Sequence, residues 1–282
     1  MTPAEDLPAG DARLDTVRSA RSFLFVPGDR PERFHKAAGA GADAVIIDLE
    51  DAVGADQKSA ARQATVRWLS SGRVACVRVN AVDGPDHEAD IAALAGLDGL
   101  LAVVLPKAVD PTAATSVAHR TGAAVIALVE SAAGMALATS LARAEGVARL
   151  AFGHLDYAVD LGADNGRTAM LHARCTLVLA SRAAGLPGPL DGVTVSLDDP
   201  ARLDDDLAHA RDLGMTGKLL IHPRQVEATH AAYLPSAKET AWAQTVLDAV
   251  RDGDGGAVRV GGEMVDAPVM ARARAILGRK DR

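Results

Sequence analysis

Three carboxylates lie within four residues, directly after an apolar run. Asp48, Glu50 and Asp51 follow Ala44-Val-Ile-Ile. Four consecutive apolar residues, two of them isoleucine, are typical of a strand that is buried on both faces. Because side chains alternate along a strand, Asp48 and Glu50 point to the same side, where unpaired carboxylates would be costly beside a core. The pattern therefore favours chemistry at this strand end, although acids that cap the next helix or face solvent fit it equally well.

Polar side chains end other apolar runs in the same way. Arg78 and Asn80 close the run that begins at Val74. Singly, each such residue has an ordinary explanation as a helix cap or a solvated side chain. Their coincidence at several strand ends indicates one shared site. The further members of this set are Lys107, Glu130, Asp156 and His222.

The elements that would position these residues are eight apolar runs separated by helical segments. Most begin at intervals of twenty to thirty residues, which predicts a closed (β/α)8 TIM barrel with its site at the carboxyl ends of the strands. No Gly-x-Gly-x-x-Gly follows the first run, so a dinucleotide-binding fold loses its main support. The expected strands lie in 23–28, 44–53, 74–80, 101–107, 123–130, 149–156, 192–196 and 217–223.

The chain divides into three parts on this interpretation. We expect a flexible tail over 1–20, the barrel over 21–223 and an extension over 224–282. The extension reads as two helical stretches, a glycine-rich break at 253–256, a hairpin over 257–266 and a last helix, without a second core. Such a segment would pack as a lid on the barrel or on a neighbouring subunit.

The composition argues against several classes of protein. Aromatic residues are 3% of the 282, so the core must be built mainly from aliphatic side chains. A net charge of −7, without a basic run interleaved with aromatics, argues against nucleic-acid binding. Cys76 and Cys175 suit small core positions rather than a disulfide or metal site. The first eighteen residues lack a signal peptide's apolar region and no stretch is long enough to span a membrane, so we expect a cytoplasmic protein.

Two of the strand-end carboxylates could share a metal ion. Glu130 and Asp156 end neighbouring strands, about 5 Å apart in a sheet. Proteins hold Mg²⁺ through one or two carboxylates and leave the other positions to water and substrate. Arg78 adds a planar fork of donors suited to a carboxylate. Metal and arginine together are what is needed to bind a 2-oxo acid.

Several short motifs follow one another along the chain: Arg21-Ser-Phe-Leu-Phe-Val-Pro-Gly28, Ile47-Asp-Leu-Glu-Asp-Ala-Val53, Val77-Arg-Val-Asn80, Leu105-Pro-Lys107, Leu128-Val-Glu130, Phe152-Gly153 leading to Asp156, Lys218 to Pro223 and Met264-Val-Asp266-Ala-Pro268. Together they resemble the citrate lyase β-subunit-like branch of the HpcH/HpaI aldolase/citrate lyase family, from about Arg21 to Leu277. The resemblance implies a TIM barrel that binds Mg²⁺ through Glu130 and Asp156, with Arg78 on the substrate carboxylate. One departure bears on the substrate: Leu155 stands where the family usually has Glu before the metal-binding Asp.

The resemblance also implies roles for residues around this centre. Asp266 would be a catalytic acid/base on a lid that covers the barrel of a neighbouring subunit, in a homotrimer or a pair of trimers. On spacing alone, an Asp before Ala-Pro and a helix is an ordinary N-cap. Glu50 and Asp51 would order metal-bound water or the surroundings of the proton donor. Arg21 and Lys107 would contact the phosphates of the thioester carrier, and for Lys107 a solvated position fits as well.

The activity implied is cleavage or formation of a carbon–carbon bond between an acyl thioester and a 2-oxo acid such as pyruvate, oxaloacetate or glyoxylate. We favour a Mg²⁺-dependent lyase that cleaves citramalyl-CoA, malyl-CoA or a similar 3-hydroxyacyl-CoA by retro-Claisen chemistry. The alternatives are a citrate lyase β-subunit that acts on an acyl carrier protein, a malate synthase-like condensation with thioester hydrolysis, and a non-catalytic binding subunit.

Overall fold

A computed structural model describes residues 10–251, 258–260 and 263–280 of the chain. It divides the chain into two compact units, Met1–His230 and Ala231–Arg282. Each unit is described by itself. The boundary lies seven residues beyond the predicted one, because the start of α11 (Gln225–Tyr233) is tied to the first unit: the Gln225 side chain donates to the Thr194 carbonyl at 2.8 Å.

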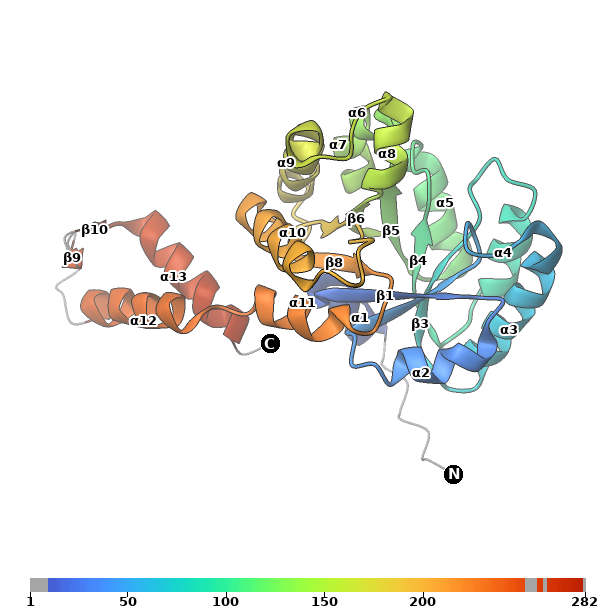
Figure 1. Ribbon diagram of the computed structural model, residues 1–282, viewed down its shortest axis with the longest axis horizontal. Coiled ribbons are helices and arrows are strands. Elements are labelled where there is room, and N and C mark those ends of the chain that lie inside the picture. Colours follow the sequence, from blue (N-terminus) through green and yellow to red (C-terminus); the bar gives the residue numbers. More distant parts are fainter. Residues whose placement is uncertain (1–9, 252–257, 261–262, 281–282) are drawn as a thin grey trace. The chain divides into compact units, whose positions relative to one another are not determined.

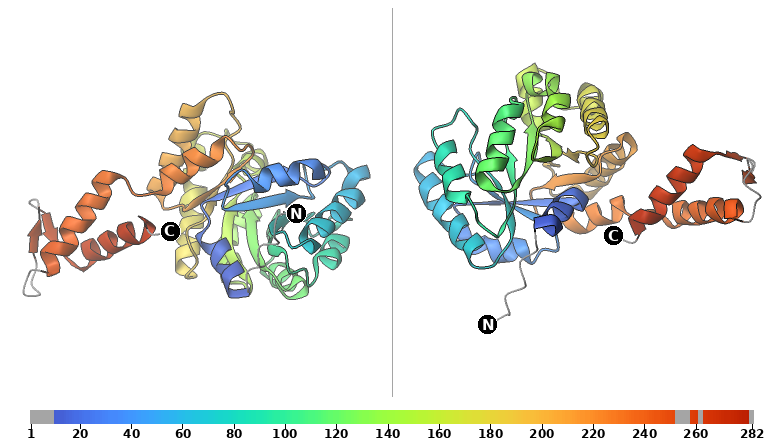
Figure 2. Two further views of the ribbon diagram at one scale, coloured as in Figure 1. Left: turned by 90° about the horizontal axis from the view of Figure 1, so that it is seen from below. Right: turned by 180° about the vertical axis from the view of Figure 1, so that it is seen from behind.

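The first unit is a closed barrel of eight parallel strands in sequence order, which confirms the predicted TIM barrel (Figure 1). Helices lie outside the ring of strands in both views of Figure 2. The strands are β1 (Ser22–Pro27), β2 (Ala44–Asp48), β3 (Ala75–Arg78), β4 (Leu100–Leu105), β5 (Ala124–Val129), β6 (Val147–Phe152), β7 (Leu190–Asp191) and β8 (Gly217–Leu220).

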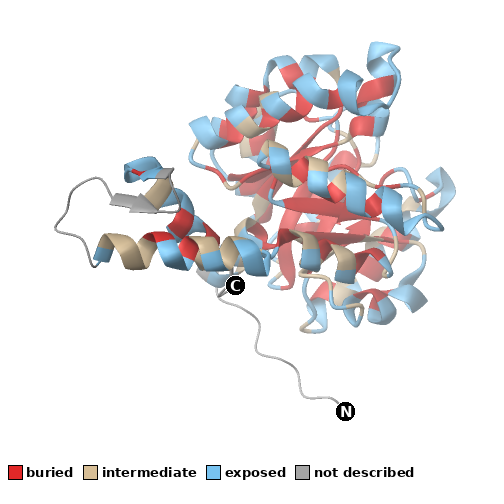
Figure 3. Cartoon of the chain, turned by 60° about the vertical axis from the view of Figure 1, so that its left-hand side comes forward, coloured by how far each residue is buried: buried red, intermediate tan, exposed pale blue. Residues whose placement is uncertain are grey.

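Alternation along each strand produces two apolar layers. Ile46 belongs to a cluster inside the barrel with Ile126 and Leu128, whereas its neighbour Ile47 packs in the larger cluster between strands and helices. The strands are accordingly buried on both faces (Figure 3), as continuous Val/Ile/Leu runs require. This rigid ring fixes the side chains at its carboxyl edge.

Most helices begin and end where the sequence signals them. Asp110 caps α5, accepting from the Thr112 N–H at 2.8 Å, with Pro111 in the first turn, and the helix ends at Gly122 with a φ of 69°. The helices of this unit, with two short 3₁₀ segments, are α1 (Gly10–Ser19), η1 (Pro31–Arg33), α2 (Phe34–Ala38), η2 (Ala55–Gln57), α3 (Lys58–Ser70), α4 (His87–Leu94), α5 (Pro111–Thr121), α6 (Ala132–Ala136), α7 (Ala138–Arg143), α8 (His154–Leu161), α9 (Arg167–Ala183), α10 (Pro200–Leu213) and α11.

The prediction of a flexible tail over 1–20 is wrong for its second half. Residues 10–19 form α1, in which Val17 is fully buried. The buried guanidinium of Arg149 donates to the carbonyls of Val17, at 3.2 Å, and of Ala20. A buried guanidinium must have acceptors, so this contact ties the segment to the barrel. Residues 1–9 lie outside the described part.

The predicted strand over 192–196 is also wrong, since β7 consists of Leu190 and Asp191 alone. Hydrogen bonds from side chains replace much of the backbone pairing that a longer strand would have made. Arg174 donates to Asp191 at 2.7 Å, and the buried Lys218 ammonium donates to the Gly192 carbonyl at 2.6 Å. The chain leaves the barrel wall at Gly192 as a result.

The second unit contains α12 (Ala237–Arg251), β9 (Val258–Val260), β10 (Glu263–Val265) and α13 (Ala267–Lys280), and β9 and β10 pair antiparallel as predicted. The expectation of no second core is wrong, because α12 and α13 bury their apolar faces against each other around Val246, Val265 and Ile276. The glycine-rich break at 253–256 lies outside the described residues. No helix in the described part is long and apolar enough to cross a membrane.

Candidate active site

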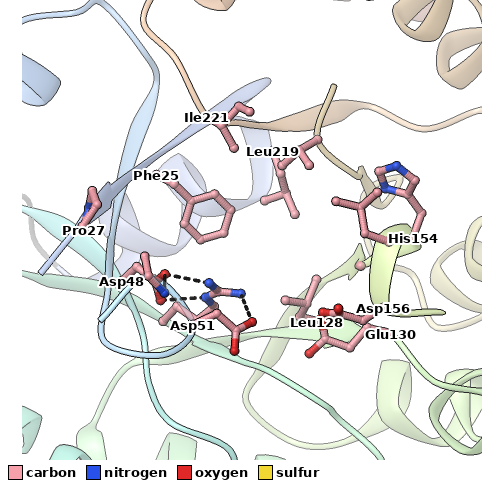
Figure 4. A pocket seen from close by; sticks show the side chains of 15 residues that line it. Phe25, Pro27, Asp48, Asp51, Leu128, Glu130, His154, Asp156, Leu219 and Ile221 are labelled. Carbon is pink, nitrogen blue, oxygen red and sulfur yellow. Dashed lines mark hydrogen bonds and ion pairs between the residues drawn. The ribbon is translucent and has the colours of Figure 1, made fainter. Parts of the chain in front are cut away.

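A pocket of about 370 Å³ opens at the carboxyl ends of the barrel strands (Figure 4). This is the end at which TIM-barrel sites lie, because the loops after the strands converge there. Fifteen residues line it: Phe25, Pro27, Asp48, Asp51, Ala52, Arg78, Leu128, Glu130, Gly153, His154, Leu155, Asp156, Val193, Leu219 and Ile221.

Arg78 is held in place by Asp48, its neighbour across β2 and β3. Nε and Nη2 of Arg78 donate to the two carboxylate oxygens of Asp48 at 2.8 and 2.6 Å. Burial opposes the charge of the guanidinium, but the hydrogen bonds and charge of Asp48 outweigh it and raise the pKa of Arg78 above its usual value. On the other edge of the fork, Nη1 lies 3.1 Å from Glu50 Oε2 and 3.7 Å from Asp51 Oδ2. The sequence predicts Asp48 at the strand end but does not predict that it holds Arg78. The pairing of these two residues across neighbouring strands is the signal that could have suggested this role.

Glu50 joins the same cluster from just beyond β2. Its Oε1 accepts a 2.6 Å hydrogen bond from Lys107 Nζ, and its Oε2 lies 3.1 Å from Arg78 Nη1. Burial raises the pKa of Glu50, while Arg78 and Lys107 counteract that rise. Glu50 is absent from the pocket lining, whereas Asp51, 57% exposed at its side chain, lies on the rim. Lys107 is therefore paired with a carboxylate rather than simply solvated.

Glu130 follows β5 and is buried at the pocket wall. Its Oε1 accepts a 2.6 Å hydrogen bond from the backbone N–H of Lys107, whose φ of 48° is the one positive value for a non-glycine in the described part. A Cβ on Gly153 would lie 2.4 Å from Glu130 Oε2, so only glycine leaves room for this carboxylate. Burial, with the charges of Glu50 and Asp156, raises the pKa of Glu130 to about 8.

Asp156 lies in the first turn of α8, four residues beyond β6, rather than on the strand as predicted. It is exposed and lines the pocket with Glu130 (Figure 4). In the described part of the chain, no three His, Cys, Asp or Glu side chains gather as a metal shell. Two carboxylates that repel one another, one of them buried, are nevertheless the protein ligands that suit Mg²⁺.

His154 is a pocket residue that sequence reasoning mentioned without assigning a role. It is buried and stands against Gly192, where a Cβ would meet its Nδ1 at 2.0 Å. Burial lowers the pKa of His154 to about 4, so the ring is neutral near pH 7. Its position at the start of α8 and beside the loop after β7 could not be predicted from spacing, because the predicted seventh strand was misplaced.

Two predicted site residues lie away from the pocket. Arg21 directly precedes β1, about 20 Å along the strand from its carboxyl end, and its Nε lies 3.5 Å from Asp43. It is therefore at the opposite end of the barrel, and the prediction that it contacts the carrier at this rim is wrong. His222 lies near the rim, but its Nδ1 accepts from the Arg224 N–H at 3.1 Å and it is absent from the lining.

Asp266 lies in the second unit, where it forms the helix cap that its spacing suggested. Its Oδ1 accepts from the Val269 N–H at 3.1 Å at the start of α13. The residue is exposed, as is Met264, whereas Val265 is buried in the core of this unit. Capping occupies Oδ1.

The family model described as HpcH/HpaI aldolase/citrate lyase matches residues 21–223, which is the whole barrel. The chain belongs to this family. It is a family of lyases, as the resemblance implied.

Individual relatives are similar in sequence to this chain over most of its length. A citrate lyase subunit beta-like protein from Mycobacterium tuberculosis is 39% identical over 264 residues, covering 91% of this chain and 94% of its own. A (3S)-malyl-CoA thioesterase from Cereibacter sphaeroides is 34% identical over 272 residues, covering 93% and 94%.

A solved structure of the M. tuberculosis protein CitE, in complex with magnesium, acetoacetate and coenzyme A, superposes with a TM-score of 0.84 at 37% identity, covering 94% of this chain and all of that one. Further structures of CitE contain magnesium with pyruvate and with oxaloacetate.

Proposed function

We propose that the chain is a Mg²⁺-dependent carbon–carbon lyase that cleaves a 3-hydroxyacyl-CoA, such as citramalyl-CoA or malyl-CoA, to acetyl-CoA and an oxo acid. The observation that carries the proposal is the convergence, in one pocket, of an arginine held by Asp48 with the carboxylates Glu130 and Asp156. The magnesium and coenzyme A bound to the mycobacterial relative support it.

Glu130 and Asp156 would hold the ion. Glu130 is prepared for a cation, since its Oε1 is fixed by the Lys107 N–H while its Oε2 faces the space that Gly153 leaves open. When bound, Mg²⁺ would supply Lewis-acid charge beside the carboxylate and hydroxyl oxygens of the substrate.

Other side chains would bind the substrate carboxylate and transfer protons. Arg78, kept in orientation by Asp48, would bind the substrate carboxylate through its Nη1/Nη2 edge in exchange for the contacts of Nη1 with Glu50 and Asp51. In the cleavage, a carboxylate acting as general base would accept the hydroxyl proton, the C3–O bond would become a carbonyl and the C2–C3 electron pair would become the thioester enolate. A protonated acid then donates to C2, giving the acetyl thioester.

We assign that acid to Asp266 of a neighbouring subunit in a homotrimer or a pair of trimers. An exposed carboxylate on a separate compact unit suits a residue that completes a site only when the unit covers it. Glu50 and Asp51 would set the local charge around the reacting centre, and Lys107 would keep Glu50 in place. The two free cysteines, one of which is exposed rather than in the core, fit a reducing cytoplasm.

The test is a product panel with purified protein, Mg²⁺ and candidate 3-hydroxyacyl-CoA thioesters, analysed by mass spectrometry. We expect cleavage to acetyl-CoA and an oxo acid in the wild type and none in Glu130→Ala or Asp156→Ala, both folded by circular dichroism. Near-normal turnover in either variant at modest Mg²⁺ would refute the metal assignment. Turnover only with a thioester on acyl carrier protein would identify a citrate lyase β-subunit instead.

A second candidate activity is condensation or cleavage accompanied by thioester hydrolysis. It is favoured by the relative described as (3S)-malyl-CoA thioesterase. The two activities differ in their products, because hydrolysis releases free coenzyme A whereas the lyase conserves the thioester. A thiol reagent added to the same assay distinguishes them.

A further inference from the structure

The rim of the pocket divides into a charged arc and an apolar arc. We infer from this division that the preferred oxo acid carries an uncharged alkyl group on its keto carbon. The inference rests on the proposed function and specifies the substrate class of the same site.

The charged arc occupies the side of the barrel from β2 to β6. Its charged members are Asp48 and Asp51 at β2, Arg78 at β3, Glu130 at β5 and Asp156 in α8, and the apolar Ala52, Leu128 and Leu155 lie among them. All the ionisable groups proposed to hold the carboxylate and the ion lie here. The shared carboxylate and keto oxygen of an oxo acid would therefore face this arc.

The apolar arc occupies the rest of the ring, from β7 through β8 to β1. Strands β8 and β1 are neighbours, with Leu219 paired to Phe23, so Leu219 and Phe25 form one surface. Val193 after β7 and Ile221 after β8 extend it. Figure 4 shows Phe25, Leu219 and Ile221 across the pocket from Asp51 and Glu130.

Arg78, inside the charged arc at β3, contacts the apolar arc through Phe25. Its guanidinium carbon lies 5.0 Å from the centre of the Phe25 ring, so apolar surface begins beside the group that would bind the carboxylate. An oxo acid bound by its carboxylate and keto oxygen has one substituent left, which must point away from both. That direction leads to Phe25, Leu219 and Ile221.

A second carboxylate at this position would lack a cation. Of the residues that line the pocket, Arg78 is the one with a positive charge, and it already binds Asp48 and lies 3.1 Å from Glu50. The nearby Lys107 ammonium is paired with Glu50 at 2.6 Å. An anion removed from water without a partner is strongly disfavoured, whereas each buried methylene gains binding energy. Because CitE from M. tuberculosis is known with oxaloacetate bound, the inference concerns relative affinity.

The test compares 2-oxobutyrate with freshly prepared oxaloacetate, which share a four-carbon chain but end in a methyl group and a carboxylate respectively, by calorimetric titration of the full chain with Mg²⁺. We expect 2-oxobutyrate to bind at least about tenfold more tightly. Ile221→Lys should lower that ratio about fivefold or more, because it places a cation on a rim position that is 39% exposed. Leu179→Lys on α9, 71% exposed and outside the pocket lining, is the matched control and should leave the ratio unchanged.

The outcomes separate this inference from the proposed function. Equal or tighter binding of oxaloacetate by the wild type, with Mg²⁺ dependence intact, would overturn the alkyl preference alone. So would an unchanged ratio in Ile221→Lys. Absence of Mg²⁺-dependent binding for every oxo acid would overturn the proposed function, and this inference with it.

Discussion

Asp48 binds Arg78 through two hydrogen bonds of 2.8 and 2.6 Å, on one edge of the guanidinium fork. The pair is buried at the base of the pocket, with Asp48 only 2% exposed. Because Asp48 also accepts from the Glu50 and Ala52 N–H groups, the carboxylate itself cannot rotate. Arg78 is thus orientated before any substrate arrives.

Replacing Arg78 by Lys should test this preorganisation. Lysine keeps the charge but lacks the second edge of the fork, so we expect affinity for the oxo acid to fall by roughly 1.5–3 kcal/mol, with affinity for coenzyme A nearly unchanged. Titration calorimetry with each ligand measures both. Arg202→Lys, whose side chain is 52% exposed and pairs with Asp206, is the control. Weakened coenzyme A binding in Arg78→Lys would show that its role has been misassigned.

Gly153→Ala should impair metal binding without touching a ligand. The added Cβ would lie 2.4 Å from Glu130 Oε2 and 2.5 Å from Glu130 Cβ, forcing that side chain to move. We expect Mg²⁺ affinity and turnover to fall about tenfold or more, as is usual when the surroundings of a ligand change. Gly166→Ala has no atom within 4 Å of the new Cβ and should behave as wild type. Unaltered Mg²⁺ affinity in Gly153→Ala would contradict the placement of Glu130.

The raised pKa of Glu130, about 8, predicts that the stability of the metal-free protein and the stabilisation added by Mg²⁺ change in opposite directions with pH. Without metal, the folded chain keeps a proton that the unfolded chain has lost, so stability from this group is present at low pH and declines as pH rises from about 4.5 to 8. Mg²⁺ must displace that proton, and its stabilising effect should therefore increase over the same range. Thermal unfolding with and without Mg²⁺ at pH 6, 7 and 8 measures both trends, and Glu130→Gln should flatten them.

Asp266→Ala separates a helix cap from a catalytic acid. Loss of the hydrogen bond to the Val269 N–H should cost about 1 kcal/mol of stability. If the other oxygen acts in catalysis, turnover should fall by about 10²-fold or more. Asp266→Asn keeps a capping acceptor and removes the acid, so it should retain stability but remain slow. Full activity in Asp266→Asn would leave the residue a cap alone.

Mixing inactive subunits tests whether Asp266 acts in trans. A hybrid oligomer of Asp266→Ala and Glu130→Ala chains can pair an intact metal site with an intact acid on different subunits. We therefore expect partial recovery of activity after subunit exchange, verified by native mass spectrometry. No recovery in demonstrated hybrids would argue for a site within one chain.

Local patterns sufficed for the barrel because each strand is a short run of aliphatic residues bounded by Gly, Pro or polar side chains. The same patterns failed at β7, where the apolar run predicted a strand over Gly192 to Ser196 but the bonding depends on Arg174 and Lys218, distant in sequence. Residue type identified Glu130 and Arg78 as pocket residues. The partners of these residues, and the displacement of Arg21 to the other end of β1, depend on three-dimensional packing that spacing does not encode.

The two-residue strand β7 has a consequence for motion. It pairs with β6 through one residue and with β8 through two, so the ring has few backbone hydrogen bonds at this point. Local opening should occur here more readily than elsewhere in the barrel, with amides of 190–196 exchanging with solvent sooner than those of β4 or β5. Val193 and His154 border this seam. The wall of the pocket could thus adapt to acyl groups of different length while the charged side stays rigid.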